Sequence, residues 1–407
     1  MEVLYPICCG LDVHKASVTA CLRRGREEEV RTFRTVTKEL LALGDWLAQA
    51  DCTHVAMEST GVYWKPIYNL LEDRFCVILV NARHIKAVPG RKTDVLDAEW
   101  IAQLLQHGLL KASFVPDRPI RELRDLTRHR TKLVQRRAAV VNRVQKVLED
   151  ANIKLASVAT DVMGVSGRAM LEALVRGETE AGTLAQLAKG RLREKLSELA
   201  EALEGRVREH HRFLLERHLR EVAFYEEEIA IFDARLEEQM RPFAEALERL
   251  DAIPGVNERI AQCLLAEVGP TLGTFPDAAH LAAWACVCPG ANESAGKHKS
   301  GKTGKGNNWL RGTLAEAAWA ASKSKDSYLA SIYQRLARRR GKKRAIVALS
   351  RVILEIVYYL LKEARNYREL GANFYDRQHA QERRRYLVKQ LEALGLEVNV
   401  RPLAAAA

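Results

Sequence analysis

The sequence has no apolar stretch that is both long enough and free enough of charge to cross a membrane. Its most apolar run, 346–361, is interrupted by Arg351 and Glu355, which predicts a buried helix. The chain also has no basic, apolar leader ending in small residues, so we expect a cytoplasmic protein. Its eight cysteines follow no regular spacing, which favours reduced thiols over a disulfide framework.

Positive charge, by contrast, is in excess. The 407 residues are 47% hydrophobic, enough for two or three domains with cores of their own, and the net charge is +12. Basic and acidic residues balance at 14 each over 1–115, but stand at 10 against 5 over 116–150 and at 14 against 3 over 289–345. We therefore expect the last two segments to contact a polyanion such as a nucleic acid.

The first hundred residues alternate short apolar runs with helical patterns. The pattern predicts strands at 7–13, 17–22, 30–36, 54–57 and 76–80, and helices at 39–50, 64–73 and 93–106. This order is typical of a mixed α/β layer. We place the α/β domain at 1–115.

From residue 119 onward the pattern is almost wholly helical, which predicts an all-α remainder. We expect a basic helical extension that binds RNA or DNA at 116–155. A linker and a long antiparallel hairpin or coiled coil are expected at 156–245, because apolar residues repeat in helical steps over 192–203 and 219–236. Within it, 157–190 is rich in Gly, Ser and Thr and predicts a looser segment. A helical C-terminal domain is expected at 246–407.

Four carboxylates occupy positions that suit a metal site. Asp12 lies inside the first predicted strand, Glu58 ends the fourth, and Asp94 and Asp97 lie three apart on a predicted helix. A charge within an apolar strand is unfavourable unless it is paired or bound to metal. Two Mg²⁺ ions require such a cluster to activate a nucleophile at phosphorus. Taken singly, each acid also suits a turn, a cap or a surface charge. Three strands, a helix and an acidic strand end follow the ribonuclease H-like order.

A glycine- and lysine-rich loop is predicted between 289 and 308. Its glycines let main-chain N–H groups approach a phosphate closely, and five cations can neutralise backbone phosphates there: Lys297, Lys299, Lys302, Lys305 and Arg311. Ser294 and Ser300 lie in the same loop, where neighbouring cations favour a hydroxyl as nucleophile on phosphorus. The segment 296–303 also fits the nucleotide-binding P-loop pattern, but no buried strand leads directly into it, so we reject ATP binding.

The segment 253–257 reads IPGVN and precedes a helical pattern, an arrangement similar to a helix-hairpin-helix. In that motif the hairpin glycine, here Gly255, and the amides of the next helix hold a DNA phosphate without reading bases. Asn257 stands where a second glycine is more usual, and asparagine tolerates the left-handed conformation.

Taken in order, these motifs resemble the insertion-sequence-110 family of DEDD transposases. The resemblance covers nearly the whole chain and rests on GLDVHK at 10–15, MESTGVYW at 57–64, KTDVLDA at 92–98, PGV at 254–256 and the segment 289–311. It implies an N-terminal RuvC-like domain with a ribonuclease H-like mixed sheet, then a long coiled coil, and a helical C-terminal transposase domain with the helix-hairpin-helix.

By motif, the resemblance implies that Asp12, Glu58, Asp94 and Asp97 hold Mg²⁺ and that Ser294 bonds covalently to DNA. The family's Ser-Ser-Gly-Gly-Lys segment reads ESAGK here, at 293–297, and departs from it at two places. Ser300 therefore stays an alternative nucleophile.

The resemblance further implies an RNA-guided DNA recombinase, whose structured bridge RNA pairs with donor and target DNA. The basic helix at 118–146 is the expected place to hold this RNA, through Arg128, Arg130, Lys132, Arg136 and Arg137. Two or four copies suit recombination. The acids and the serine meet either within one chain or, as we favour, across a dimer. Two alternatives stay open: a metal-dependent nuclease or junction resolvase that uses water as nucleophile, and a non-catalytic nucleic-acid scaffold.

Overall fold

The computed structural model describes residues 2–82, 85, 97–290, 292–294, 297–378 and 380–400. The chain divides into two compact units, Met1–Pro116 and Asp117–Ala407. Among the described helices, none is long and apolar enough to cross a membrane.

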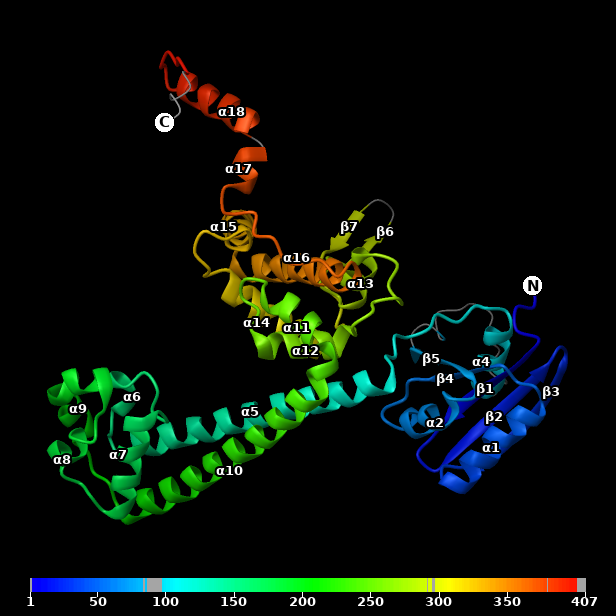
Figure 1. Cartoon of the computed structure of the whole chain (residues 1–407), viewed down its shortest axis with the longest axis horizontal. Coiled ribbons are helices and arrows are strands. Elements are labelled where there is room, and N and C mark those ends of the chain that lie inside the picture. The colour runs from blue at the N-terminus through cyan, green and yellow to red at the C-terminus, as the bar shows by residue number, and fades with distance from the viewer. Residues whose placement is uncertain are drawn as a thin grey trace. The chain divides into compact units, whose positions relative to one another are not determined.

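The first unit is built on a five-stranded sheet with the order β3-β2-β1-β4-β5 (Figure 1). Its strands are β1 (Ile7–Val13), β2 (Ser17–Arg24), β3 (Glu27–Arg34), β4 (His54–Glu58) and β5 (Cys76–Val80). The first three pair antiparallel, while β1, β4 and β5 run parallel. The mixed α/β layer expected from the sequence is confirmed.

The third strand begins earlier than its apolar residues indicate. The prediction placed it at 30–36, but pairing with β2 continues to Arg24↔Glu27, next to the turn at Gly25. Backbone pairing in a hairpin needs no apolar side chain, so the charged residues Glu27, Glu28 and Glu29 join the strand. Strand β3 therefore occupies Glu27–Arg34.

Helices cover both faces of the sheet. Helices α1 (Thr37–Gln49) and α2 (Trp64–Leu71) pack on the face that carries Cys9, Leu11 and Val13. Helix α4 (Asp97–Gln106) packs on the opposite face, which carries Cys8 and Ala56. Because side chains alternate along a strand, every second residue of β1 and β4, counted from Cys8 and Ala56, faces α4.

Two long helices of the second unit lie side by side (Figure 1). They are α5 (Arg118–Asp150) and α10 (Glu209–Met240). Ion pairs join them: Arg130–Asp233, Arg137–Glu226 and Arg143–Glu221. The residue numbers along α5 rise from one pair to the next while those along α10 fall, so the two helices are antiparallel. An antiparallel helix pair is present, but the predicted bounds were wrong: its first helix is α5, which we expected to form a separate basic extension, and the 192–203 segment is not part of it.

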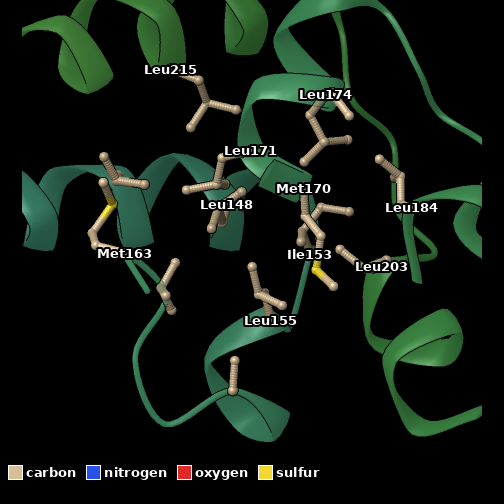
Figure 2. Packing of buried hydrophobic residues seen from close by; sticks show 14 of the residues in the cluster. Leu148, Ile153, Leu155, Met163, Met170, Leu171, Leu174, Leu184, Leu203 and Leu215 are labelled. Atoms are coloured by element: carbon tan, nitrogen blue, oxygen red, sulfur yellow. The ribbon is translucent and has the colours of Figure 1, made fainter. Parts of the chain in front are cut away.

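The segment between these helices forms a small helical lobe with its own core. It contains α6 (Leu155–Val158), α7 (Val165–Arg176), α8 (Ala181–Ala185), a 3-10 turn η1 (Gly190–Lys195) and α9 (Leu196–Leu203). Leu155, Met170, Leu171 and Leu203 are buried together with Leu148 at the end of α5 (Figure 2). The leucines at 199 and 203 thus serve the lobe, and the segment expected to be loose contains α7 and α8.

Four helices of the rest of the second unit pack around α16 (Lys342–Lys362). The elements of this part are η2 (Arg241–Phe243), α11 (Ala244–Asp251), α12 (Glu258–Val268), α13 (Ala278–Trp284), β6 (Asn292–Ser294), β7 (Lys297–Ser300), α14 (Asn308–Ala321), α15 (Tyr328–Arg340), α17 (Phe374–Gln378) and α18 (Ala380–Ala393). Helix α16 contacts α11, α13, α14 and α15 and buries Leu349, Ile353 and Val357. The apolar run at 346–361 is therefore the buried helix that the sequence predicted.

Candidate functional site

Two of the predicted acids lie next to each other at the carboxyl edge of the sheet. The parallel pairing of β1 and β4 reaches Leu11↔Met57, so Asp12 and Glu58 follow on adjacent strands. By alternation they share the face of Cys8 and Ala56, which α4 covers. The sheet itself therefore brings these two carboxylates to one side.

The third acid reaches this face because α4 approaches β1 closely. A Cβ at Gly10 would lie 2.3 Å from the carbonyl oxygen of Ala98 and 2.4 Å from the amide nitrogen of Ala102. Only glycine accommodates a helix backbone at this distance. Asp97 is the first residue of α4 and directly precedes Ala98. Asp94 lies outside the described residues.

Local hydrogen bonds orient the two strand-end acids. The Nε2 of His14 lies 3.1 Å from Oδ2 of Asp12, and the Thr60 hydroxyl donates to Oε1 of Glu58 over 3.0 Å. The Asp12 side chain is 28% exposed, so it is accessible to a ligand. In the part of the chain that the structure describes, no three His, Cys, Asp or Glu side chains are close enough to hold an ion. The donors present are all carboxylate oxygens, which suit a hard cation.

The predicted serine loop contains a short hairpin. Strands β6 and β7 pair antiparallel, with Ser294 opposite Lys297 and Glu293 opposite His298. Ser294 ends β6, while Ser300 ends β7 and accepts a hydrogen bond from the amide of Lys302 over 3.1 Å. The two candidate nucleophiles thus lie at opposite ends of the hairpin.

Arg311 organises this loop from α14. Its guanidinium donates to the carbonyl oxygens of Gly304 and Lys305, both over 2.8 Å, and to the Thr303 hydroxyl over 3.2 Å. Both terminal nitrogens of Arg311 make hydrogen bonds within the loop, and its expected contact with phosphates stays a prediction. These hydrogen bonds hold the loop backbone at 303–305 against α14.

A buried acid that the sequence reasoning missed ties the loop to α5. Glu267 is 2% exposed and accepts two hydrogen bonds from Arg128, over 2.7 and 2.8 Å, and one from the Asn307 amide over 2.6 Å. Asn307 also caps α14, at the end of the loop. Burial lowers the pKa of the neighbouring Arg124 to about 10, with Glu267 opposing that shift. A glutamate inside the apolar run of α12 was the sequence signal for this site.

The arginines predicted to bind RNA on α5 are largely paired with acids of the same chain. Arg128 binds Glu267, Arg130 binds Asp233, and Arg137 binds Glu226; these three carboxylates belong to α12 and α10. Their local charge is therefore partly neutralised.

The other two predicted contacts on α5 are more available. Lys132 is exposed, with its Nζ 5.2 Å from the centre of the Trp309 ring. Arg136 is exposed and has no acidic partner among the described residues. The charge of this helix that remains open to a polyanion is therefore smaller than its composition indicates.

The predicted hairpin at 253–257 does connect two helices, α11 and α12. Gly255 has φ +87°, and a Cβ there would lie 2.3 Å from the Ala321 amide nitrogen and 2.5 Å from the Ala317 carbonyl oxygen. Close packing on α14 thus requires this glycine. Asn257 is extended, not left-handed, because its side chain caps α12 by accepting from the Ile260 amide over 2.9 Å. DNA binding by the hairpin stays a prediction.

Comparisons with known proteins identify similar sequences over most of the chain. Residues 9–153 match the IS110-type DEDD domain, described as a transposase, and residues 247–334 match a domain described as the transposase IS116/IS110/IS902 family. Together the matches span more than half of the chain. A Pseudomonas aeruginosa protein named "Probable family 20 transposase" is 26% identical over 369 residues, which are 88% of this chain and 94% of that relative. The four acids fall in the first match and Ser294 in the second.

Proposed function

Because this chain belongs to the IS110 family of transposases, and is thus an enzyme that acts on DNA in transposition or recombination, we propose that it cuts and rejoins strands through a phosphoserine intermediate at Ser294. The observation that supports this most is the convergence of acids on one sheet face. Asp12 and Glu58 end adjacent parallel strands, and Gly10 admits the start of α4, with Asp97, to the same side.

The acidic set is proposed to hold a divalent cation, Mg²⁺, through Asp12, Glu58 and Asp97, with Asp94 as the fourth acid. Bound there, the ion would supply Lewis-acid stabilisation of charge on a phosphate. The chain's own side chains orient the donors: His14 contacts Asp12 and Thr60 donates to Glu58. These contacts restrain two of the donors, but the described carboxylates do not lie close enough together to hold an ion, so binding would require them to move closer.

The proposed strand cleavage is a transesterification. The Ser294 hydroxyl loses its proton as its oxygen bonds to phosphorus, and the bond from phosphorus to the leaving strand's oxygen breaks. That oxygen takes a proton and becomes a free hydroxyl. In the reverse direction, a hydroxyl of the exchanged strand attacks the phosphoserine and regenerates Ser294. The ester conserves the bond energy, so no ATP is consumed.

A structured guide RNA is proposed as the partner that selects the DNA. Its support is the surplus of basic residues over 116–150 and the exposed side chains of Lys132 and Arg136 on α5. The acids belong to one unit and Ser294 to the other. We propose that two chains, in a dimer or tetramer, share these groups.

The test is covalent capture. The chain is incubated with RNA transcribed from the DNA that flanks its coding region, Mg²⁺ and an end-labelled DNA spanning the element's junction. Denaturing gels should show a protein–DNA adduct for the parent and for Ser300→Ala, and none for Ser294→Ala. Ser300→Ala is the matched control because it removes the other hydroxyl of the hairpin.

Three outcomes would overturn the proposal or part of it. Cleavage without an adduct in both the parent and Ser294→Ala would support a nuclease or resolvase that uses water. An adduct lost only in Ser300→Ala would move the nucleophile to that residue. Binding without any cleavage in Mg²⁺ would support the non-catalytic scaffold.

A further inference from the structure

A basic groove lies beside the serine hairpin, between the loop at 300–303 and the first turns of α16. Its volume is about 1050 Å³. Pockets of roughly 300–1,000 Å³ enclose ligands the size of one or a few nucleotide units. Five cations line it, contributed by the loop and by α15 and α16: Lys302, Arg340, Lys343, Arg344 and Arg351.

Most of the charge of this groove is not neutralised by acids among the described residues. No acidic residue lines it among the described residues, and Arg351 is paired with Glu355 over 2.7 Å. Arg340, Lys343 and Arg344 are exposed and have no acidic partner in the described part of the chain. This contrasts with α5, where Arg128, Arg130 and Arg137 are paired. A groove that keeps free cations attracts an anion.

The local sequence supports the same conclusion. Lys342, Lys343 and Arg344 form the first turn of α16, which contains no acid and has no side-chain cap. Cations at the positive end of a helix are unfavourable, and natural helices prefer acids there. Such a departure from local preference indicates a functional requirement. Here the requirement falls on Lys343 and Arg344, which line the groove, while Lys342 does not line it.

The floor of the groove is apolar, which indicates the kind of polyanion. It is formed by Val287, Pro289, Val347 and Ala348. A duplex keeps its bases paired and stacked in its interior, so it cannot lay them on such a floor. A single strand can place phosphates against the cations and its sugars on the apolar side chains.

The groove reaches the end of β7, in the hairpin of the proposed nucleophile. Ser300 lines the groove at the end of β7, and Lys297, the partner of Ser294, lies three residues earlier on that strand. Three residues of a strand span about 10 Å. We propose that this groove binds the single-stranded DNA next to the phosphate that Ser294 attacks. The inference rests on the proposed function in that the ligand is a cleaved DNA strand.

Binding of a fluorescein-labelled oligothymidylate tests the groove apart from the chemistry. The full chain carries Ser294→Ala and is kept in EDTA, so neither cleavage nor metal affects the reading. Lys343→Ala with Arg344→Ala should weaken binding about tenfold or more. The slope of log K against log salt concentration should become less steep by about 1.4, because two cations are removed. The control, Arg339→Ala with Lys342→Ala, removes the same charge from exposed neighbours outside the groove and should change binding far less.

Parallel arms use the matching RNA strand and a DNA duplex. Equal losses in the two double variants would overturn the inference, because general charge would then explain binding. A loss as large for RNA, or confined to the duplex, would overturn the assignment to single-stranded DNA. Adduct formation with Ser294 restored is measured separately. If Lys343→Ala with Arg344→Ala leaves strand binding unchanged and the parent forms the adduct, only the groove is rejected. If the double variant loses strand binding and the parent forms no adduct, only the serine chemistry is rejected.

Discussion

At the scale of single residues, Gly10 sets how closely α4 approaches β1. The missing side chain lets Ala98 and Ala102 of α4 lie directly on β1. Asp97 directly precedes Ala98 on the helix, and Asp12 follows Gly10 by two residues on the strand. Any side chain at position 10 forces the helix away from the sheet. The position of Asp97 relative to Asp12 therefore depends on a residue that carries no functional group.

Gly10→Ala is expected to destabilise the first unit by about 3 kcal/mol, the upper range for overpacking, because its Cβ meets helix backbone that cannot rotate away. Hydrogen–deuterium exchange of peptides from β1, β4 and α4 should become faster, and adduct formation should fall. Gly44→Ala is the control, since its Cβ would meet the flexible end of Arg74 at 3.1 Å. Equal exchange rates in parent and Gly10→Ala would show that α4 is not held at this contact.

At the scale of elements, ion pairs decide how the second unit is assembled. Glu226 of α10 accepts hydrogen bonds from Arg137 of α5, over 3.0 and 2.6 Å, and from Arg168 of α7, over 2.7 and 2.8 Å. Burial acts to raise the pKa of Glu226, but these hydrogen bonds outweigh it and hold the pKa below its ordinary value. One carboxylate thus joins three helices.

A depressed carboxyl pKa stabilises the fold above the unfolded pKa, about 4.3 for glutamate, and this contribution is lost as the pH falls through the folded pKa. Glu226→Gln should therefore lower stability by about 1 kcal/mol near neutral pH, after allowance for solvent screening. The difference from the parent should shrink below about pH 4. Thermal melts followed by circular dichroism across this range measure it.

The matched control for this experiment is Glu238→Gln on the same helix. Among the described residues, Glu238 pairs only within α10, with Arg235 over 2.6 Å, and both side chains are exposed. An exposed pair of this kind contributes about 0.5 kcal/mol or less. If the stability difference between Glu226→Gln and the parent stays constant as the pH falls, the proposed link between the ionisation of Glu226 and stability is contradicted.

At the scale of the whole molecule, the proposed catalytic groups are divided between two units with separate cores. The first unit has its core on both sides of the sheet, and the second has a core in the lobe at the end of α5. The acids belong to Met1–Pro116 and Ser294 to Asp117–Ala407. Catalysis therefore requires the units to meet, within a chain or between chains.

Co-expression of Asp12→Ala with Ser294→Ala chains tests sharing between chains. Each variant alone should form no adduct. Random pairing in a symmetric dimer gives mixed dimers with one complete site, so the mixture should recover about a quarter of the parent's adduct. Asp12→Ala with Glu58→Ala is the control, because both substitutions remove the same acidic set. Recovery no greater than in this control would show that each chain supplies both groups itself.

Much of the fold was predictable because it depends on local spacing. Alternation and turn residues predicted the five strands of the first unit, and helical periodicity predicted α5 and the buried α16. Asp12 and Glu58 were recognisable as acids in or at the end of apolar strands. These features follow from two periods, 2.0 and 3.6 residues, which any short window of sequence reveals.

Only the tertiary structure decided which distant segments touch. It paired α10 with α5, gave Arg128 and Arg137 acidic partners 139 and 89 residues away, and packed Gly255 against α14. It also gathered Lys302 and Lys343 into one groove. The sequence by itself determined the elements and the residues with chemical potential, because those depend on neighbours along the chain. Partners and open charges depend on packing between segments that share no local pattern, and only the folded chain specifies that packing.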